Sequence, residues 1–184
     1  MASERNSRKA RSALRLTVVG LLSAVLLACS SDDPISAGLV CPDAVIVADA
    51  ARLVKFQGTG RDLTDVLFEA EVDDVNIACT YDDDENAIEA ELQVLLLANR
   101  GPADQGRQAQ FRYFVAIATS NRAVLAREEF DLAIPFEGNR TRVAIAEQLE
   151  PRIPLAPGQT GGEYRVFVGL SLTPEELDYN RRNR

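Results

Sequence analysis

The sequence predicts an all-β fold, an antiparallel sandwich of two sheets. From Cys41 to residue 172, apolar and polar residues alternate in short runs, which is the pattern of half-buried strands. Polar clusters rich in Gly, Pro, Asn and Asp separate the runs, and no long amphipathic helical pattern intervenes. About seven such runs favour a sandwich, and a closed barrel is the alternative.

The expected strands follow this alternation along the chain. The first run is expected to break near residues 48–52. The clearest run is residues 88–96, where Glu89, Glu91 and Gln93 alternate with apolar residues. The seven runs are residues 45–56, 66–81, 88–96, 111–117, 124–136, 143–155 and 164–172.

The alternation in the second run changes phase at Asp73 and Asp74. Val72 ends one alternating stretch and Val75 begins the next, one position out of step. Because one extra residue would turn every following side chain to the opposite face, a β-bulge is expected between Val72 and Val75.

The last residues, 173–184, follow a different pattern. Thr173 is a candidate N-cap, Pro174 stands at the first helical position, and Glu176 can complete a capping box. We therefore expect a short C-terminal helix, with Leu177 and Tyr179 packed on the sandwich.

The expected arrangement of strands resembles immunoglobulin-like sandwiches in its architecture. The Cys–Trp–Cys pattern of antibody domains is absent, because the chain has no tryptophan. The resemblance therefore implies a fold of antiparallel strands and no particular activity.

The N-terminus has the layout of a secretory signal. Basic residues between Arg5 and Arg15 precede an apolar run of 13 residues, Leu16–Ala28. A membrane-spanning helix needs about 20 apolar residues, so residues 1–28 are expected to be a signal peptide.

The end of this run, Leu26, Leu27, Ala28 and Cys29, resembles the lipobox of bacterial lipoproteins. The resemblance implies that Cys29 receives a diacylglyceryl group, that the peptide before it is removed, and that the new amine is usually acylated. Membrane lipid is then a partner through acylated Cys29, and the protein faces the periplasm. An ordinary signal peptide that ends near a cysteine is the alternative.

Residues 29–40 read as the lipidated cysteine and a flexible tether, because they are small, polar and turn-prone. In lipoproteins of two-membrane bacteria, an aspartate directly after the cysteine tends to retain the protein in the inner membrane. Ser30 occupies that position, which favours the outer membrane.

The other two cysteines, Cys41 and Cys79, form an even pair in an oxidising compartment once Cys29 carries lipid. We expect a disulfide between them. A metal site and two separate buried thiols are the alternatives, but two thiols without histidine do not complete a metal site.

The mature chain is strongly acidic. Removing the five basic residues and the one acidic residue of 1–28 leaves 15 basic and 27 acidic side chains, a net charge of −12. A domain with such a charge and no basic stripe repels nucleic acid and anionic lipid surfaces, so nucleic-acid binding is not expected. The chain also lacks histidine, the commonest general base and metal ligand.

Two motifs partly resemble ligand-binding loops. The acidic residues Asp82–Glu85 lack the spacing of a calcium loop and read as a solvated hairpin tip. Gly58 and Gly60 lack the lysine and hydroxyl residue of a phosphate loop, so they read as turn residues. No cofactor or metal is therefore expected.

The sequence favours an anchored binding or structural module of the cell envelope, not an enzyme, formed by a sandwich at residues 41–172 and a tail at 173–184. Its partner would be an envelope protein or a glycan, bound through loops or sheet edges. The alternatives are a hydrolase that uses loop carboxylates in Gly58–Asp65 and a subunit of a larger envelope complex.

Overall fold

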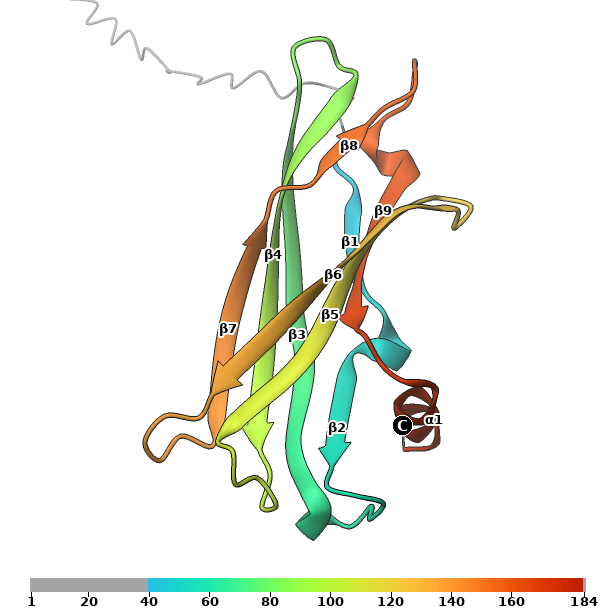
Figure 1. Cartoon of the computed structure of the whole chain (residues 1–184). Coiled ribbons are helices and arrows are strands. Elements are labelled where there is room, and N and C mark those ends of the chain that lie inside the picture. Colours follow the sequence, from blue (N-terminus) through green and yellow to red (C-terminus); the bar gives the residue numbers. More distant parts are fainter. Residues whose placement is uncertain (1–39, 184) are drawn as a thin grey trace, which may run out of the picture. The chain divides into compact units, whose positions relative to one another are not determined.

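Alternating apolar residues build two sheets that face each other in the computed structural model, which describes residues 40–183 (Figure 1). One sheet has four strands in the order β1-β9-β5-β6, and the other has the order β2-β3-β4-β7, with β8 also paired to β4. The strands are β1 (Asp43–Ile46), β2 (Arg52–Phe56), β3 (Val66–Tyr81), β4 (Ala87–Arg100), β5 (Gln108–Thr119), β6 (Val124–Pro135), β7 (Arg142–Leu149), β8 (Arg152–Pro154) and β9 (Tyr164–Leu170). The expected all-β sandwich is confirmed.

Nine strands in the described residues replace the seven expected, because two of the runs are divided. The break predicted near residues 48–52 is present: the 3-10 helix η1 (Ala48–Ala50) carries the chain from β1 in one sheet to β2 in the other. The run 143–155 is divided at Pro151, whose carbonyl accepts the Ala90 N–H at 3.1 Å. Both halves pair with β4.

The pairing is antiparallel, as expected, with one exception that the sequence did not predict. Strand β1 pairs in parallel with β9, from Asp43 opposite Arg165 to Ile46 opposite Val168. The reason is topological: β1 is not joined to its neighbour by a hairpin, because η1 takes the chain to the other sheet.

The bulge expected in the second run is confirmed. The register between β3 and β4 shifts between Val72 and Asp74, which leaves Asp73 without a partner residue on β4. Val72 is buried and Val75 packs against the core. The extra residue therefore keeps both halves of a 16-residue strand facing the same interior.

The core lies between the sheets and includes Leu92, Leu96 and Val168, all fully buried. Its largest member is Tyr113, 1% exposed, whose ring stacks on Phe130 with centroids 5.0 Å apart. The Tyr113 hydroxyl has no hydrogen-bond partner among the described residues. Burial, reinforced by the nearby Glu147 and Glu128, raises the pKa of Tyr113 to about 12.

The C-terminal helix α1 (Pro174–Arg182) begins as expected. The Thr173 hydroxyl accepts the Glu176 N–H at 3.2 Å, and the Glu176 carboxylate accepts the Thr173 N–H at 2.9 Å. Tyr179 packs edge-on against Phe56 of β2, with ring centroids 5.3 Å apart, as the sequence predicted.

Helix α1 also covers a sheet edge. Strand β2 ends the five-stranded sheet, and Asn180 of α1 donates from Nδ2 to the Arg52 carbonyl at 2.6 Å. Figure 1 shows α1 beside β2, on the side away from β3. Because unpaired edge groups invite pairing with other chains, this contact protects the edge.

The predicted disulfide joins Cys41, just before β1, to Cys79 of β3, with Cα atoms 5.8 Å apart. These strands belong to different sheets, so the disulfide links the beginning of the sandwich to the opposite layer.

We expect loss of the disulfide to lower the free energy of unfolding substantially. The two cysteines are 38 positions apart, and closing a loop of that size stabilises by about 4 kcal/mol on the chain-entropy estimate. Urea unfolding of Cys41→Ser/Cys79→Ser should show this loss. Adding reductant to that variant is the control, and an unchanged unfolding midpoint in the variant would contradict the expectation.

Tyr113→Phe removes a buried hydroxyl without a partner and keeps the ring that stacks on Phe130. At neutral pH we expect unchanged stability or a gain of about 1 kcal/mol in the free energy of unfolding.

The same variant should also change the alkaline limit of stability. An unfolded tyrosine ionises near pH 10 and folded Tyr113 near 12, so the unfolded state loses its proton first. The wild-type protein therefore loses about 2 kcal/mol between pH 10 and 12 that Tyr113→Phe retains. Parallel pH profiles of the two proteins in thermal melts would contradict this.

Candidate functional site

The chain enters the sandwich at Val40, and this point is held by the far end of β3. The Tyr81 hydroxyl donates to the Val40 carbonyl at 2.7 Å and accepts the Gly161 N–H at 2.8 Å. Gly161 leaves no room for a Cβ, because the Val40 carbonyl oxygen already fills that space. Together with the adjacent Cys41–Cys79 disulfide, these contacts fix the position of Val40 on the sandwich.

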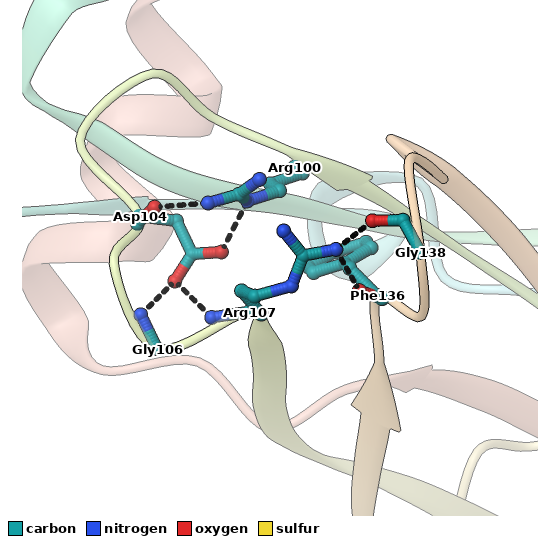
Figure 2. A network of polar contacts seen from close by, with 6 residues as sticks. All are labelled: Arg100, Asp104, Gly106, Arg107, Phe136 and Gly138. Carbon is teal, nitrogen blue, oxygen red and sulfur yellow. Dashed lines mark hydrogen bonds and ion pairs between the residues drawn. The ribbon is translucent and has the colours of Figure 1, made fainter.

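The opposite end of the sandwich carries a network of polar contacts around Asp104 (Figure 2). Asp104 is the only charged residue buried among residues 40–183, at 8% exposure. Its Oδ2 accepts from Arg100 Nε at 2.8 Å, and its Oδ1 accepts the N–H groups of Gly106 and Arg107 at 2.9 and 3.0 Å. One carboxylate thus holds the whole β4–β5 loop.

Arg107 ties that loop to the β6–β7 loop. Its Nη2 donates to the carbonyls of Phe136, at 2.8 Å, and Gly138, and its own carbonyl accepts the Phe136 N–H at 2.8 Å (Figure 2). Its φ of 55° lies in the left-handed region, which costs energy for an arginine, so these bonds hold a strained backbone in place. The network holds the β4–β5 and β6–β7 loops in place. Its members do not include a base next to a nucleophile, as a catalytic site would need.

A groove of about 510 Å³ lies between β2, the first half of β5 and the start of α1. Its wall includes the apolar side chains of Leu53, Phe111 and Leu132 and the charged side chains of Lys55, Arg112, Asp131 and Glu176. A neighbouring hollow of about 390 Å³ shares Lys55 and Glu176. An apolar floor with a few polar groups is the usual form of a binding groove.

The charges of the groove are already paired. Lys55 Nζ lies 2.9 Å from Glu176 Oε1, and Arg112 Nη1 lies 3.0 Å from Glu129 Oε2. Desolvation opposes ionisation of Glu176, but the Thr173 N–H and the Lys55 ammonium outweigh it and lower its pKa. An ionised carboxylate has no proton to donate at neutral pH, and its lowered pKa and its bond to the Lys55 ammonium make it a weak general base, so it suits binding better than proton transfer.

The structure brings Cys41 and Cys79 together as the sequence predicted, whereas Cys29 lies outside the described residues. The acidic residues Asp82–Glu85 form the turn between β3 and β4. Asp82 Oδ1 accepts the N–H groups of Asn86 and Ala87, and its Oδ2 pairs with Arg152 at 3.0 Å.

The Asp82 carboxylate is therefore used by the turn itself. Partial desolvation favours the neutral acid, but the Ala87 and Asn86 N–H groups and the Arg152 guanidinium outweigh it and lower the pKa of Asp82. Across residues 40–183, no three His, Cys, Asp or Glu side chains converge to hold a metal ion.

Gly58 and Gly60 lie in the β2–β3 connection, where they act as turn residues. Gly58 has φ +64°, and the Asp65 side chain fills the space that a Cβ on Gly60 would need. In the same loop, Asp65 Oδ2 accepts the Asp62 N–H at 3.1 Å and completes the capping box of the 3-10 helix η2 (Leu63–Asp65).

Sequence reasoning missed the Asp104 network. An aspartate followed two positions later by glycine is an ordinary turn pattern, and Asp104 and Gly106 form that pattern here. This pattern does not predict that the carboxylate is buried, or that Arg107 donates a hydrogen bond to Phe136, 29 positions away.

Comparisons of the chain with protein-family models, with curated proteins and with solved structures find no match. Within the described part of the chain, no helix has the length and apolar character needed to cross a membrane.

We expect Asp104→Ala to destabilise the domain by about 3 kcal/mol, because two N–H groups and the partly buried Arg100 guanidinium lose their acceptor. Thermal unfolding measures the loss, and amide exchange should accelerate at residues 101–107 and 136–141.

Asp131→Ala is the matched control for this prediction. Its carboxylate is 93% exposed, so its removal should change stability by less than about 0.5 kcal/mol. Equal effects of the two substitutions would show that the Asp104 network does not hold the loops.

Proposed function

We propose that this protein is an envelope lipoprotein, anchored through acylated Cys29 and facing the periplasm, whose sandwich is a rigid binding or structural module. The lipobox-like residues Leu26–Cys29 are the observation that carries the anchor. Their position 11 residues before the fixed point at Val40 suits an anchor, a short tether and a folded domain in that order.

The way the domain begins supports this order. Tension on a tether would reach the sandwich at Val40 and Cys41, where the disulfide and the Tyr81 hydroxyl share it with β3. A force that acts on both sheets starts local unfolding less easily than a force that acts on one short edge strand such as β1.

A binding or structural role fits the described residues better than hydrolysis. In the loop Gly58–Asp65, which was the candidate for catalytic carboxylates, Asp62 and Asp65 serve the capping box of η2. The two carboxyls with displaced pKa values, Asp82 and Glu176, belong to different elements and are each bound to a cation. Neither is paired with a second carboxyl in the manner of an acid and base.

The partner that fits this proposal is an envelope protein or a glycan. The groove beside β2 and α1 combines apolar floor residues with paired charges, which suits a neutral or mixed-charge ligand. The net charge of −12 in the mature chain argues against nucleic acid. We place the protein at the outer membrane because Ser30 follows the cysteine.

Cys29→Ser tests the anchor. Metabolic labelling with a palmitate analogue should mark the wild-type protein, and the label and the membrane association should both be lost in Cys29→Ser. Cys41→Ser/Cys79→Ser is the matched control, because it removes two cysteines and leaves the lipobox intact. The anchor would be refuted if the label marked Cys29→Ser, or if it failed to mark the wild-type protein.

The same strains test the module. After mild cross-linking, the anchored protein should capture a stoichiometric envelope component that Cys29→Ser, away from the membrane, does not. Capture of nothing, together with hydrolysis of an envelope substrate by the purified protein, would overturn the binding role in favour of the hydrolase alternative.

A further inference from the structure

The exposed apolar side chains are distributed unevenly over the domain. Among residues 40–183, five large hydrophobic residues are exposed, and two of them, Val124 at 62% and Leu125 at 55%, are adjacent at the start of β6. Val40, at 54%, lies where the chain enters. Leu63, at 83%, lies in the β2–β3 connection at the opposite end of the sandwich (Figure 1).

The β5–β6 turn and the entering chain are connected through the 3-10 helix η3 (Gly161–Glu163). The Glu163 carbonyl accepts the Ser120 N–H at 2.8 Å, and a Cβ on Gly162 would lie 3.4 Å from a methyl group of Val40. Ser120 begins the turn that leads to Val124. The β5–β6 turn and the entering chain therefore both contact η3.

The outer face of the four-stranded sheet continues from the β5–β6 turn. Val124 lies opposite Ala118 of β5, which lies opposite Arg165 of β9. One row further, Ala116 lies between Arg127 and Phe167, and Phe167 lies opposite Val45 of β1. Ala116 and Ala118 are buried but do not belong to the core between the sheets, so this row faces outward.

The outer face of the four-stranded sheet carries charges of both signs. Arg122 and Arg165 are exposed beside Val124, and Asp43 lies 3.7 Å from Arg165. Further along the face, Arg112 and Arg127 both pair with Glu129. The exposed apolar side chains, rather than an excess of one charge, therefore distinguish the Val124 side of the domain.

We propose that Val124 and Leu125, which we call the apolar tip, rest on the lipid surface when the chain is anchored. Exposed apolar side chains at a turn match the chemistry of the boundary between headgroups and acyl chains. The inference rests on the proposed anchor at Cys29. It adds an orientation, with the four-stranded sheet toward the bilayer and the Asp104 end away from the entering chain.

Because the tether is short, a weak contact between the apolar tip and the lipid is sufficient to orient the domain. The 11 steps from Cys29 to Val40 extend to at most about 40 Å, so the end of the domain at Val40 stays within that distance of an anchored Cys29. Binding within a tether is intramolecular, and a short link supplies an effective concentration of the order of millimolar. Two aliphatic side chains can hold the domain in one orientation under these conditions.

The test uses the lipidated mature protein in phosphatidylcholine vesicles that carry a nitroxide headgroup lipid. A bimane label on Ala123→Cys reports from the β5–β6 turn, and one on Thr64→Cys, at the opposite end, is the matched control. Flotation of the vesicles measures the anchor separately. We expect several-fold stronger quenching at residue 123 than at residue 64.

Val124→Ser/Leu125→Ser should lower the ratio of lipid-bound to free tips by about tenfold for each apolar side chain removed. Leu63→Ser should leave the quenching at residue 123 unchanged. Both sites are exposed, so circular dichroism melts should show that all variants remain folded.

The outcomes separate the two proposals. If the wild-type protein does not float with the vesicles, the anchor and the tip contact both fail. If it floats but labels at residues 123 and 64 are quenched equally, the anchor stands and the tip contact is overturned. Quenching at residue 123 that survives Val124→Ser/Leu125→Ser also overturns it, because another part of the chain then makes the contact.

Discussion

Burial of one face of every strand is the constraint on which this structure depends. Each strand presents alternate residues to the interior, and a change of phase would expose apolar residues along its remaining length. The bulge at Asp73 meets this constraint within β3, and η1 meets it between β1 and β2 by moving the chain to the other sheet. The same demand places Tyr113 in the core although its hydroxyl finds no partner among the described residues.

The two ends of the sandwich are held by different interactions, and the difference fits the proposed role. Where the chain enters, a disulfide and the Tyr81 hydroxyl join residues 40 and 41 to the opposite sheet. At the other end, the Asp104 carboxylate and the Arg107 guanidinium fasten two loops by hydrogen bonds. A covalent link suits the end that would bear a tether. A charge-assisted network suits an end that presents loops in a single arrangement.

The sheet edges and faces are also unequal. Helix α1 covers the edge of β2 through Asn180 and Tyr179, so this edge is protected from pairing with other chains. The face of the four-stranded sheet near β6 carries exposed Val124 and Leu125, whereas its arginines are paired with acidic residues such as Glu129. In the proposed orientation, these two apolar side chains are the part of the domain that faces the bilayer.

The sequence by itself determined the features that depend on neighbouring residues. Alternation with a period of two identified the strands and the bulge, and Thr173, Pro174 and Glu176 specified the start of α1. Only the tertiary structure decided the parallel pairing of β1 with β9, the buried carboxylate of Asp104 and the proximity of Val40 to the β5–β6 turn. The physical reason is that alternation fixes which face of a strand is buried, but not which strand lies beside it. Pairings between distant segments are selected by the packing of the whole core.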